Sequence, residues 1–495
     1  MKTRSTTACA LAIAMLLLTA CDATVTNPKP SADLPPIYPD YVGVTIPAEI
    51  APMNFTLQPA LTYDLMDVRA RGSVGGEIHS QGMCADFDID DWHSLTRENK
   101  GGRITFTVCA RHDGEWTQFA DFTMDVSPNP LSDYGLTYRR IAPGYEVGGN
   151  MGIYQRELST FSEEALVTQG ALGGQCFNCH TANATNPDRV TMQIRGETGG
   201  TLIMKDGRQS WLNTRTDSTK MAGSYAYWHP GGDYIAYTAG LVEQCFFVGN
   251  GKPIEVYHRF GNIVVLDVRS NELITDSRLM TPDWVEIFPS FSPDGRTLYY
   301  STSRNVRLPY GYEGVKCSIV ALPFDSATGT FGAQADTLLN GPKDDASYVL
   351  ARPSYDGRWL MYAKCSRSNF PIQQPDADLY VMNTATRETW PLAAANSPLA
   401  ESYPNWSSDS RWVVFESKRE NGQYTQLYLC GIAGDGRATK AFILPQRDPW
   451  NYYHNMMDAY NVPDFTRTRV DFDIIEAKEK VLSGRRTEVK VRGGK

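Results

Sequence analysis

The sequence lacks the common hydrolase motifs. Its 495 residues contain neither G-x-S-x-G, which carries the nucleophile of many hydrolases, nor the zinc-binding H-E-x-x-H of metalloproteases. Long helical periodicities are also scarce, whereas 41 Gly, 29 Pro and an aromatic set of 19 Phe, 26 Tyr and 10 Trp are present. A net charge of −9 argues against a nucleic-acid partner. These features predict an all-β protein, and no hydrolase motif accompanies them.

The first twenty residues predict an exported protein. Lys2 and Arg4 precede the apolar run 8–18, and L-T-A-C follows as a lipobox ending at Cys21. About ten apolar residues cannot cross roughly 30 Å of hydrocarbon, so residues 1–20 indicate a signal peptide rather than a membrane helix. Cys21 would carry lipid and residues 21–40 would form a tether. No acidic run follows the lipid, which favours a periplasm-facing anchor in the bacterial envelope, in the outer membrane rather than the inner.

Cys176, Cys179 and His180 form a single C-x-x-C-H motif. Two thiols at this spacing can form thioethers to one haem, and the next histidine is placed as an axial iron ligand. The alternatives are a redox dithiol, a partial zinc site or a chance match. Zinc needs four ligands and no second Cys or His pair follows, while a thioredoxin-like dithiol belongs to a strand-to-helix junction rather than a glycine-rich segment. We therefore expect one covalent haem c with His180 as proximal ligand.

The sixth iron ligand would decide the chemistry of such a haem. Met192, Met204 and Met221 follow the motif and are the distal candidates, although each is also a plausible core residue. The segment lacks the three helical patterns of a cytochrome c fold, so the haem would have to pack on neighbouring domains, or the site is vestigial. A second C-x-x-C-H, expected of a two-haem peroxidase, is absent.

Beyond residue 224 the sequence repeats itself. The segments 228–237, 291–300, 353–362 and 406–415 each run through an Asp-Gly-like turn into an alternating strand. The turn requires a positive φ, which explains its glycines and the substitute Ser410. A second hairpin follows in each repeat, with strands at 262–267, 318–322, 378–382 and 426–429. Four strands at a regular period predict a β-propeller over 224–475. Strands at 201–204 and 210–213, completed by 470–474, would give five blades, and a degenerate sixth is the alternative.

The remaining segments flank this propeller. Short strands between residues 41 and 127 predict a β-sandwich-like domain. Residues 128–223 are expected to be a connector with the haem-c motif, part of a first blade and one helix at 159–167, capped by Ser162. The basic stretch 476–495 is expected to be a solvated tail.

Ten cysteines are present, and those not assigned to the signal peptide, lipid or haem number six. An even remainder in an oxidising compartment predicts three disulfides. Cys84 and Cys109 share the N-terminal domain and would pair there. Positions within the repeats favour Cys245 with Cys317 and Cys365 with Cys430, each pair joining neighbouring blades.

These motifs resemble a known family. The W/F-S-P-D-G-R-x-L-x-Y pattern, followed by T-S-R at 302–304 or S-K-R at 417–419, resembles the WD-like repeats of TolB-type periplasmic proteins over about 224–445. The stretch 153–161, the C-x-x-C-H motif and R-G-E-T-G-G at 195–200 are similar to bacterial lipoproteins that join one haem-c motif to TolB-like repeats. The resemblance implies an envelope location and a propeller, and it implies no reaction.

Two functions follow as hypotheses. The first is a lipid-anchored haem-c protein for electron transfer or redox sensing, whose propeller docks an envelope protein partner. The second is a propeller scaffold that binds an envelope protein or glycan, with Cys176, Cys179 and His180 in a structural role.

Overall fold

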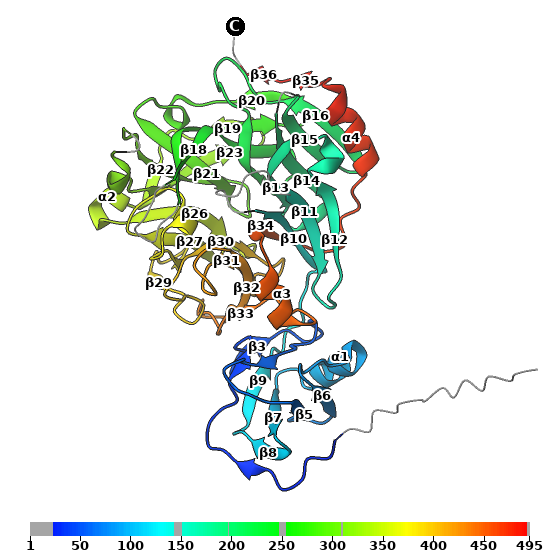
Figure 1. Ribbon diagram of the computed structural model, residues 1–495. Helices are drawn as coiled ribbons and strands as arrows, with labels where there is room; N and C mark the ends of the chain where they lie inside the picture. Colours follow the sequence, from blue (N-terminus) through cyan, green and yellow to red (C-terminus); the bar gives the residue numbers. More distant parts are fainter. Residues whose placement is uncertain (1–22, 143–150, 197, 247–253, 308–309, 493–495) are drawn as a thin grey trace, which may run out of the picture.

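The computed structural model describes residues 23–142, 151–196, 198–246, 254–307 and 310–492 (Figure 1). These residues form an N-terminal domain and a β-propeller whose six blades surround a central channel. The all-β propeller expected from the repeats is confirmed, and of the two blade numbers left open the described residues form six. Among the described residues, no helix is long and apolar enough to span a membrane.

The strands of each blade follow one another from the channel outward, except in blade 1. Blade 1 has β34 (Ala459–Thr466), β10 (Gly135–Ile141), β11 (Met151–Glu157) and β12 (Glu163–Thr168). Blade 2 has β13 (Cys176–Asn183), β14 (Asn186–Arg195), β15 (Gly200–Lys205) and β16 (Arg208–Asn213). Blade 3 has β17 (Gly223–Trp228), β18 (Tyr234–Phe246), β19 (Ile254–Asp267) and β20 (Glu272–Ile274).

The second half of the ring has the same order. Blade 4 has β21 (Trp284–Phe291), β22 (Thr297–Arg304), β23 (Ser318–Asp325), β24 (Thr330–Phe331) and β25 (Asp336–Leu339). Blade 5 has β26 (Ser347–Pro353), β27 (Trp359–Cys365), β28 (Asp378–Asn383) and β29 (Thr389–Pro391). Blade 6 has β30 (Glu401–Trp406), β31 (Trp412–Ser417), β32 (Gln426–Gly431) and β33 (Phe442–Ile443). Two short helices lie between these strands, α2 (Gly341–Asp344) and α3 (Pro449–Asn455).

Blade 1 closes the ring with strands from both ends of the propeller. The inner strand β34 comes from the C-terminal side and pairs antiparallel with β10, in a register that places Leu136 opposite Phe465. Residues 470–474, expected to complete a blade, take no part in this closure. The strands expected at 201–204 and 210–213 are β15 and β16, so the connector 128–223 in fact supplies three strands of blade 1 and all of blade 2.

A serine and an aspartate fix the turn that follows each well-preserved inner strand. In blade 4 the Ser292 hydroxyl donates to Asp294 at 2.5 Å and accepts the Thr297 N–H at 3.0 Å. Blades 5 and 6 repeat this arrangement with Ser354 and Ser407. The expected positive φ is present, at 72° for Gly295 and 60° for Ser410. The S-x-D-G pattern is therefore a backbone requirement of the turn rather than a functional signature.

Every inner strand also contains one extra residue, a β-bulge, near its middle. The ladder registers shift at this point in all six blades. At each bulge a non-glycine residue has a φ between 45° and 59°, in the left-handed region that such residues seldom occupy. The six bulge residues are Cys179, Tyr225, Phe288, Leu350, Tyr403 and Val462.

The N-terminal domain differs from the expected sandwich. Its main sheet has seven strands and is covered by one helix, α1 (Ile89–Glu98), whose Trp92 is fully buried and contacts Phe106 of the sheet. Asp88 caps the helix by accepting the N–H groups of Asp90 and Asp91. The strands are β1 (Lys29–Pro30), β3 (Thr45–Ile46), β5 (Leu65–Gly72), β6 (Glu77–Gly82), β7 (Arg103–His112), β8 (Glu115–Gln118) and β9 (Phe122–Val126), with a separate pair β2 (Ile37–Tyr38) and β4 (Thr56–Leu57).

This domain packs on the outer edge of blade 6. The Asn54 side-chain amide donates to the Arg447 carbonyl at 3.0 Å, and Lys440 pairs with Asp40 at 2.8 Å. One buried apolar cluster contains residues of both the domain and the propeller, from Phe106 to Phe442. The domain is therefore attached through a shared core rather than a flexible linker.

Two further expectations are wrong. Residues 159–167 do not form a helix: Glu163 and Glu164 begin strand β12 and form ion pairs with Arg140 and Arg469. The C-terminal stretch is not a free tail either. Helix α4 (Ile474–Ser483) buries Ala477 and Val481 against blade 2. Strands β35 (Thr487–Glu488) and β36 (Lys490–Val491) extend the outer edges of blades 2 and 3.

Candidate functional site

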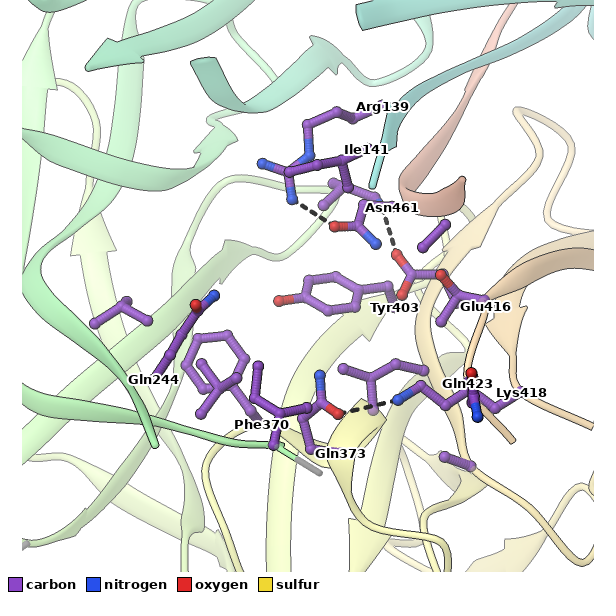
Figure 2. A pocket seen from close by; sticks show the side chains of 18 of the residues that line it. Arg139, Ile141, Gln244, Phe370, Gln373, Tyr403, Glu416, Lys418, Gln423 and Asn461 are labelled. Atoms are coloured by element: carbon purple, nitrogen blue, oxygen red, sulfur yellow. Dashed lines mark hydrogen bonds between the residues drawn. The ribbon is translucent and has the colours of Figure 1, made fainter. Parts of the chain in front are cut away.

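A cavity of about 320 Å³ lies at the mouth of the central channel (Figure 2). Its walls come from the beginnings of inner strands and from the loops that join the second and third strands of the blades. These segments vary in sequence, whereas the turns at the other end of the inner strands carry the repeated motif. The volume lies within the range of small-molecule sites.

Bulge residues close the channel beneath this cavity. The Phe288 ring of blade 4 is 4.9 Å from Tyr225 of blade 3 and 6.4 Å from Tyr403 of blade 6. Blades 4 and 6 are not neighbours, so the second contact reaches across the channel. Phe288 is 1% exposed, and Leu350 of blade 5 is fully buried. The cavity is therefore a cup with an aromatic floor.

One wall of the cup is a connected polar cluster from blades 1 and 6. The Arg139 guanidinium donates to the Asn461 side-chain oxygen, and the backbone N–H of the next residue, Val462, donates to Glu416. Tyr403 lies beside Glu416, with its hydroxyl directed into the cavity in Figure 2. Strand β34 thus holds Arg139 and Glu416 on the same wall, and we name Arg139, Tyr403, Glu416 and Asn461 the polar cluster.

Glu416 is the one carboxylic acid of this cluster, and its surroundings shift its pKa strongly. The residue is fully buried, and its Oε2 has no hydrogen-bond partner among the described residues. Burial raises the pKa of Glu416 to about 8, while the Val462 N–H and the positive charges of Arg139 and Lys418 act in the opposite direction. At neutral pH the side chain is a protonated carboxyl, and a protonated carboxyl can donate a hydrogen bond.

The opposite wall combines amides with apolar and aromatic surface. Lys418 donates to the Gln373 side-chain oxygen at 3.0 Å, and Gln244 and Phe370 lie further round the rim (Figure 2). The long hairpin of β18 and β19 reaches over this side. Its His258 stacks on Phe370 with ring centroids 4.9 Å apart, and burial lowers the pKa of His258 to about 3.

The C-x-x-C-H motif forms the beginning of the inner strand β13. Cys176 lines the cavity, Cys179 is the bulge residue of blade 2, and His180 is 2% exposed. Burial lowers the pKa of His180 to about 4, and the Thr137 backbone of the neighbouring β10 faces its ring. The motif, expected in a glycine-rich connector, therefore lies in a strand of the central ring.

The strand places these residues on different sides of the sheet. His180 lies opposite Met192, and Phe177 opposite Ile194, in the ladder with β14. Directly opposed residues share a face, so His180 and Phe177 face blade 1, where Phe177, Met192 and Ile194 join the same apolar cluster. Cys176 lies opposite Arg195 and faces the other way. One porphyrin cannot be bonded to Cys176 and ligated by His180 in this arrangement, so these residues do not fit a c-type haem.

The expected distal ligands do not change this conclusion. Met192 directly opposes His180 on the same face of the sheet, whereas a sixth ligand must lie across the haem from the fifth. Met192 and Met204 are buried in apolar clusters, and Met221 is half-buried before β17. The predicted lipid attachment site, Cys21, lies outside the described residues.

A mass measurement tests the haem expectation. We expect the protein, expressed with a cytochrome c maturation system, to carry no mass increment of a covalent haem and to show no c-type band in a reduced pyridine haemochrome spectrum. The reason is that thioether formation at Cys176 and ligation by His180 require the same face of β13, whereas the two residues lie on opposite faces. Cys176→Ala is the control, since a haem adduct present in the wild type and lost in this variant would contradict the structure.

The structure does not form the expected disulfides: Cys84, Cys109, Cys245, Cys317, Cys365 and Cys430 are free thiols. Cys109 is on β7 and Cys84 follows β6, and β5 lies between those strands. Two strand spacings, about 9–10 Å, exceed the reach of a disulfide. The Cys317 thiol contacts the Ser368 carbonyl of blade 5 at 3.8 Å, away from blade 3, which carries Cys245.

Cys365 and Cys430 are also separate in the structure. The Cys365 thiol contacts the Arg367 carbonyl at 2.9 Å within its own loop. Cys430 is fully buried on β32, and burial raises its pKa to about 12. A thiol held in the protonated form is a poor nucleophile, so Cys430 is a core residue.

Most residues of the cup carry no sequence motif. Of the predicted site residues only Cys176 lines it, whereas Arg139, Tyr403, Glu416 and Asn461 carried no motif. A usable signal was present: Tyr403 and Val462 precede the proline of their inner strands, as Phe288 does. Aligning the repeats through that proline would have identified these residues as neighbours around the channel.

Comparisons with known proteins return only distant structural likeness. No family model matches the sequence, and no curated protein matches it. An oligogalacturonate lyase in complex with manganese has a TM-score of 0.35 and 11% identity, over 62% of this chain and 73% of the other. Prolyl oligopeptidase B from Galerina marginata has a TM-score of 0.35 and 10% identity, over 68% of this chain and 41% of the other. A puromycin-hydrolyzing peptidase of Mycobacterium tuberculosis has a TM-score of 0.32 and 13% identity, over 70% of this chain and 52% of the other.

Proposed function

We propose that this protein is a binding propeller that holds a short glycan in the cup at the channel mouth. The observation that carries the proposal is the composition of the cup: aromatic rings beside amides and charged groups, around a buried Glu416 oxygen without a partner. Sugars present C–H faces that pack on aromatic rings and hydroxyls that exchange hydrogen bonds with amides and acids. A haem-dependent role has less support because Cys176 and His180 lie on opposite faces of β13.

The predicted export supports the same proposal. A lipid at Cys21 would anchor the protein in the cell envelope, where glycans are abundant. The cavity is too small for a folded partner, so a whole envelope protein could contact only the rim. The C-x-x-C-H residues then have the structural role of an inner strand.

Glycan binding can be tested with a panel of defined oligosaccharides and isothermal titration calorimetry. We expect Tyr403→Ala to weaken binding about tenfold, which corresponds to about 1.4 kcal/mol, because the ring at the cup floor is lost. Tyr310→Ala is the matched control, since Tyr310 is 86% exposed and does not line the cup. Equal losses in the two variants, or no binding by the wild type, would count against the proposal.

A further inference from the structure

The polar cluster restricts what kind of sugar the cup can hold. Arg139 projects from β10 of blade 1 and Glu416 from β31 of blade 6, and β34 lies between these strands and connects the two residues through Asn461 and Val462. The Arg139 guanidinium also donates to the Phe177 carbonyl at 3.4 Å, so both its position and its plane are fixed. A fixed guanidinium is suited to a planar, two-oxygen anion.

The balance of charge in the cup favours an anion. Three basic residues line it, Arg139, Arg195 and Lys418, and Glu416 is the one acid among the described lining residues. Arg195 is exposed at the end of β14 and forms no ion pair with the described residues. A protonated Glu416 adds no negative charge and presents a hydrogen-bond donor instead.

We infer that the glycan bound in the cup carries a carboxylate, which Arg139 and Glu416 hold between them. This inference rests on the proposed function and names its ligand class, an acidic sugar. The guanidinium donates two hydrogen bonds to the carboxylate, and the Glu416 O–H donates a third. A neutral sugar leaves the same donors facing a hydroxyl, which cannot accept as many hydrogen bonds.

This arrangement makes binding dependent on pH. The charged and titratable groups that face Glu416 are Arg139 from β10, Lys418 beyond the end of its own strand and Tyr403 from β30. The pKa of Tyr403 is raised well above its usual value by burial, so this phenol stays neutral. When Glu416 loses its proton, the donor becomes a negative charge beside the ligand's carboxylate. Binding of an acidic sugar must therefore weaken as pH rises through about 8.

The test compares cellobiouronic acid with its neutral counterpart cellobiose, titrated by calorimetry at pH 6 and pH 9. For the wild type we expect the acid to bind at least tenfold more tightly than cellobiose at pH 6, and this ratio to fall severalfold at pH 9. Glu416→Gln keeps a donor at both pH values, so its ratio should not change between them. Arg139→Gln should bring the ratio close to one.

Matched variants separate these effects from loss of folding. Arg140→Gln alters the neighbouring residue, which pairs with Glu163 and Asp458 outside the cup, and should keep the wild-type ratio. If Arg139→Gln does not fold, Arg195→Gln at the exposed rim should lower the ratio instead. Equal binding of both disaccharides at both pH values overturns the carboxylate inference and leaves glycan binding intact. No binding of either disaccharide overturns the proposed function itself.

Discussion

A chain that ends at Asp458 is expected to lose the cooperative folding of the propeller. This truncation removes β34, the inner strand of blade 1, with the fully buried Phe465 and the almost fully buried Tyr460. Without β34 the edge of β10 is exposed to water, and blade 6 loses the strand that packs against its β30 and β31. The free energy lost with this buried surface and these backbone hydrogen bonds exceeds the net stability of a typical fold, about 5–15 kcal/mol. Differential scanning calorimetry measures the outcome.

A second truncation provides the control. A chain that ends at Gly484 keeps β34 and α4 and loses only β35 and β36, which add short edges to blades 2 and 3. We expect it to unfold in one cooperative transition, somewhat below that of the full chain. A chain ending at Asp458 that melts as the full chain does would show that the ring does not depend on β34.

Replacing Glu416 by Gln is expected to stabilise the protein at high pH and to change little at low pH. The carboxyl has a pKa of about 8 when folded and 4.5 ordinarily, so the folded state binds the extra proton between these values. Stability of the wild type must therefore fall as pH rises from about 4.5 to 8, by on the order of 4–5 kcal/mol for complete ionisation. Glutamine keeps the acceptor for the Val462 N–H and never ionises, so the variant avoids this loss.

Urea unfolding at pH 5 and pH 9 measures the difference. Burial also raises the pKa of Glu286 to about 7 and that of Asp464 to about 6, but these groups are common to both proteins and cancel in the comparison. Glu420→Gln is the control, because Glu420 accepts a hydrogen bond from Tyr428 and does not line the cup. The prediction is wrong if Glu416→Gln differs from the wild type by the same free energy at both pH values.

The propeller was predictable because its turns have strict local requirements. Gly295 and Gly357 occupy positions with a positive φ, and the preceding Ser and Asp satisfy the backbone of the same turn. Such requirements act within about ten residues and leave a visible repeat. The ring closure depends instead on Arg139 and Asn461, which are 322 residues apart along the chain. No local pattern indicates such a pairing, so the repeats do not identify β34 as the strand that closes the ring.

The candidate site was predicted poorly for a related reason. C-x-x-C-H describes residue types at a spacing, and its chemistry requires a conformation that brings all three to one side. In β13 the side chains of Cys176 and His180 point to opposite faces of the sheet. The C-x-x-C-H residues therefore form part of an inner strand instead of a haem site. Glu416 illustrates the converse: nothing nearby in the sequence indicates that it will be buried, because the groups that bury it come from other blades.

The aromatic floor determines how a ligand can travel. Because Phe288 and Tyr403 meet across the channel, a molecule that enters the cup must leave by the same opening. A polymer cannot thread through the ring, so only a chain end or a short side branch can reach Arg139 and Glu416. Binding would then depend on the number of chain ends and not on chain length. Cutting a polysaccharide into pieces would increase the number of ends that the protein can bind, without changing the affinity for any one end.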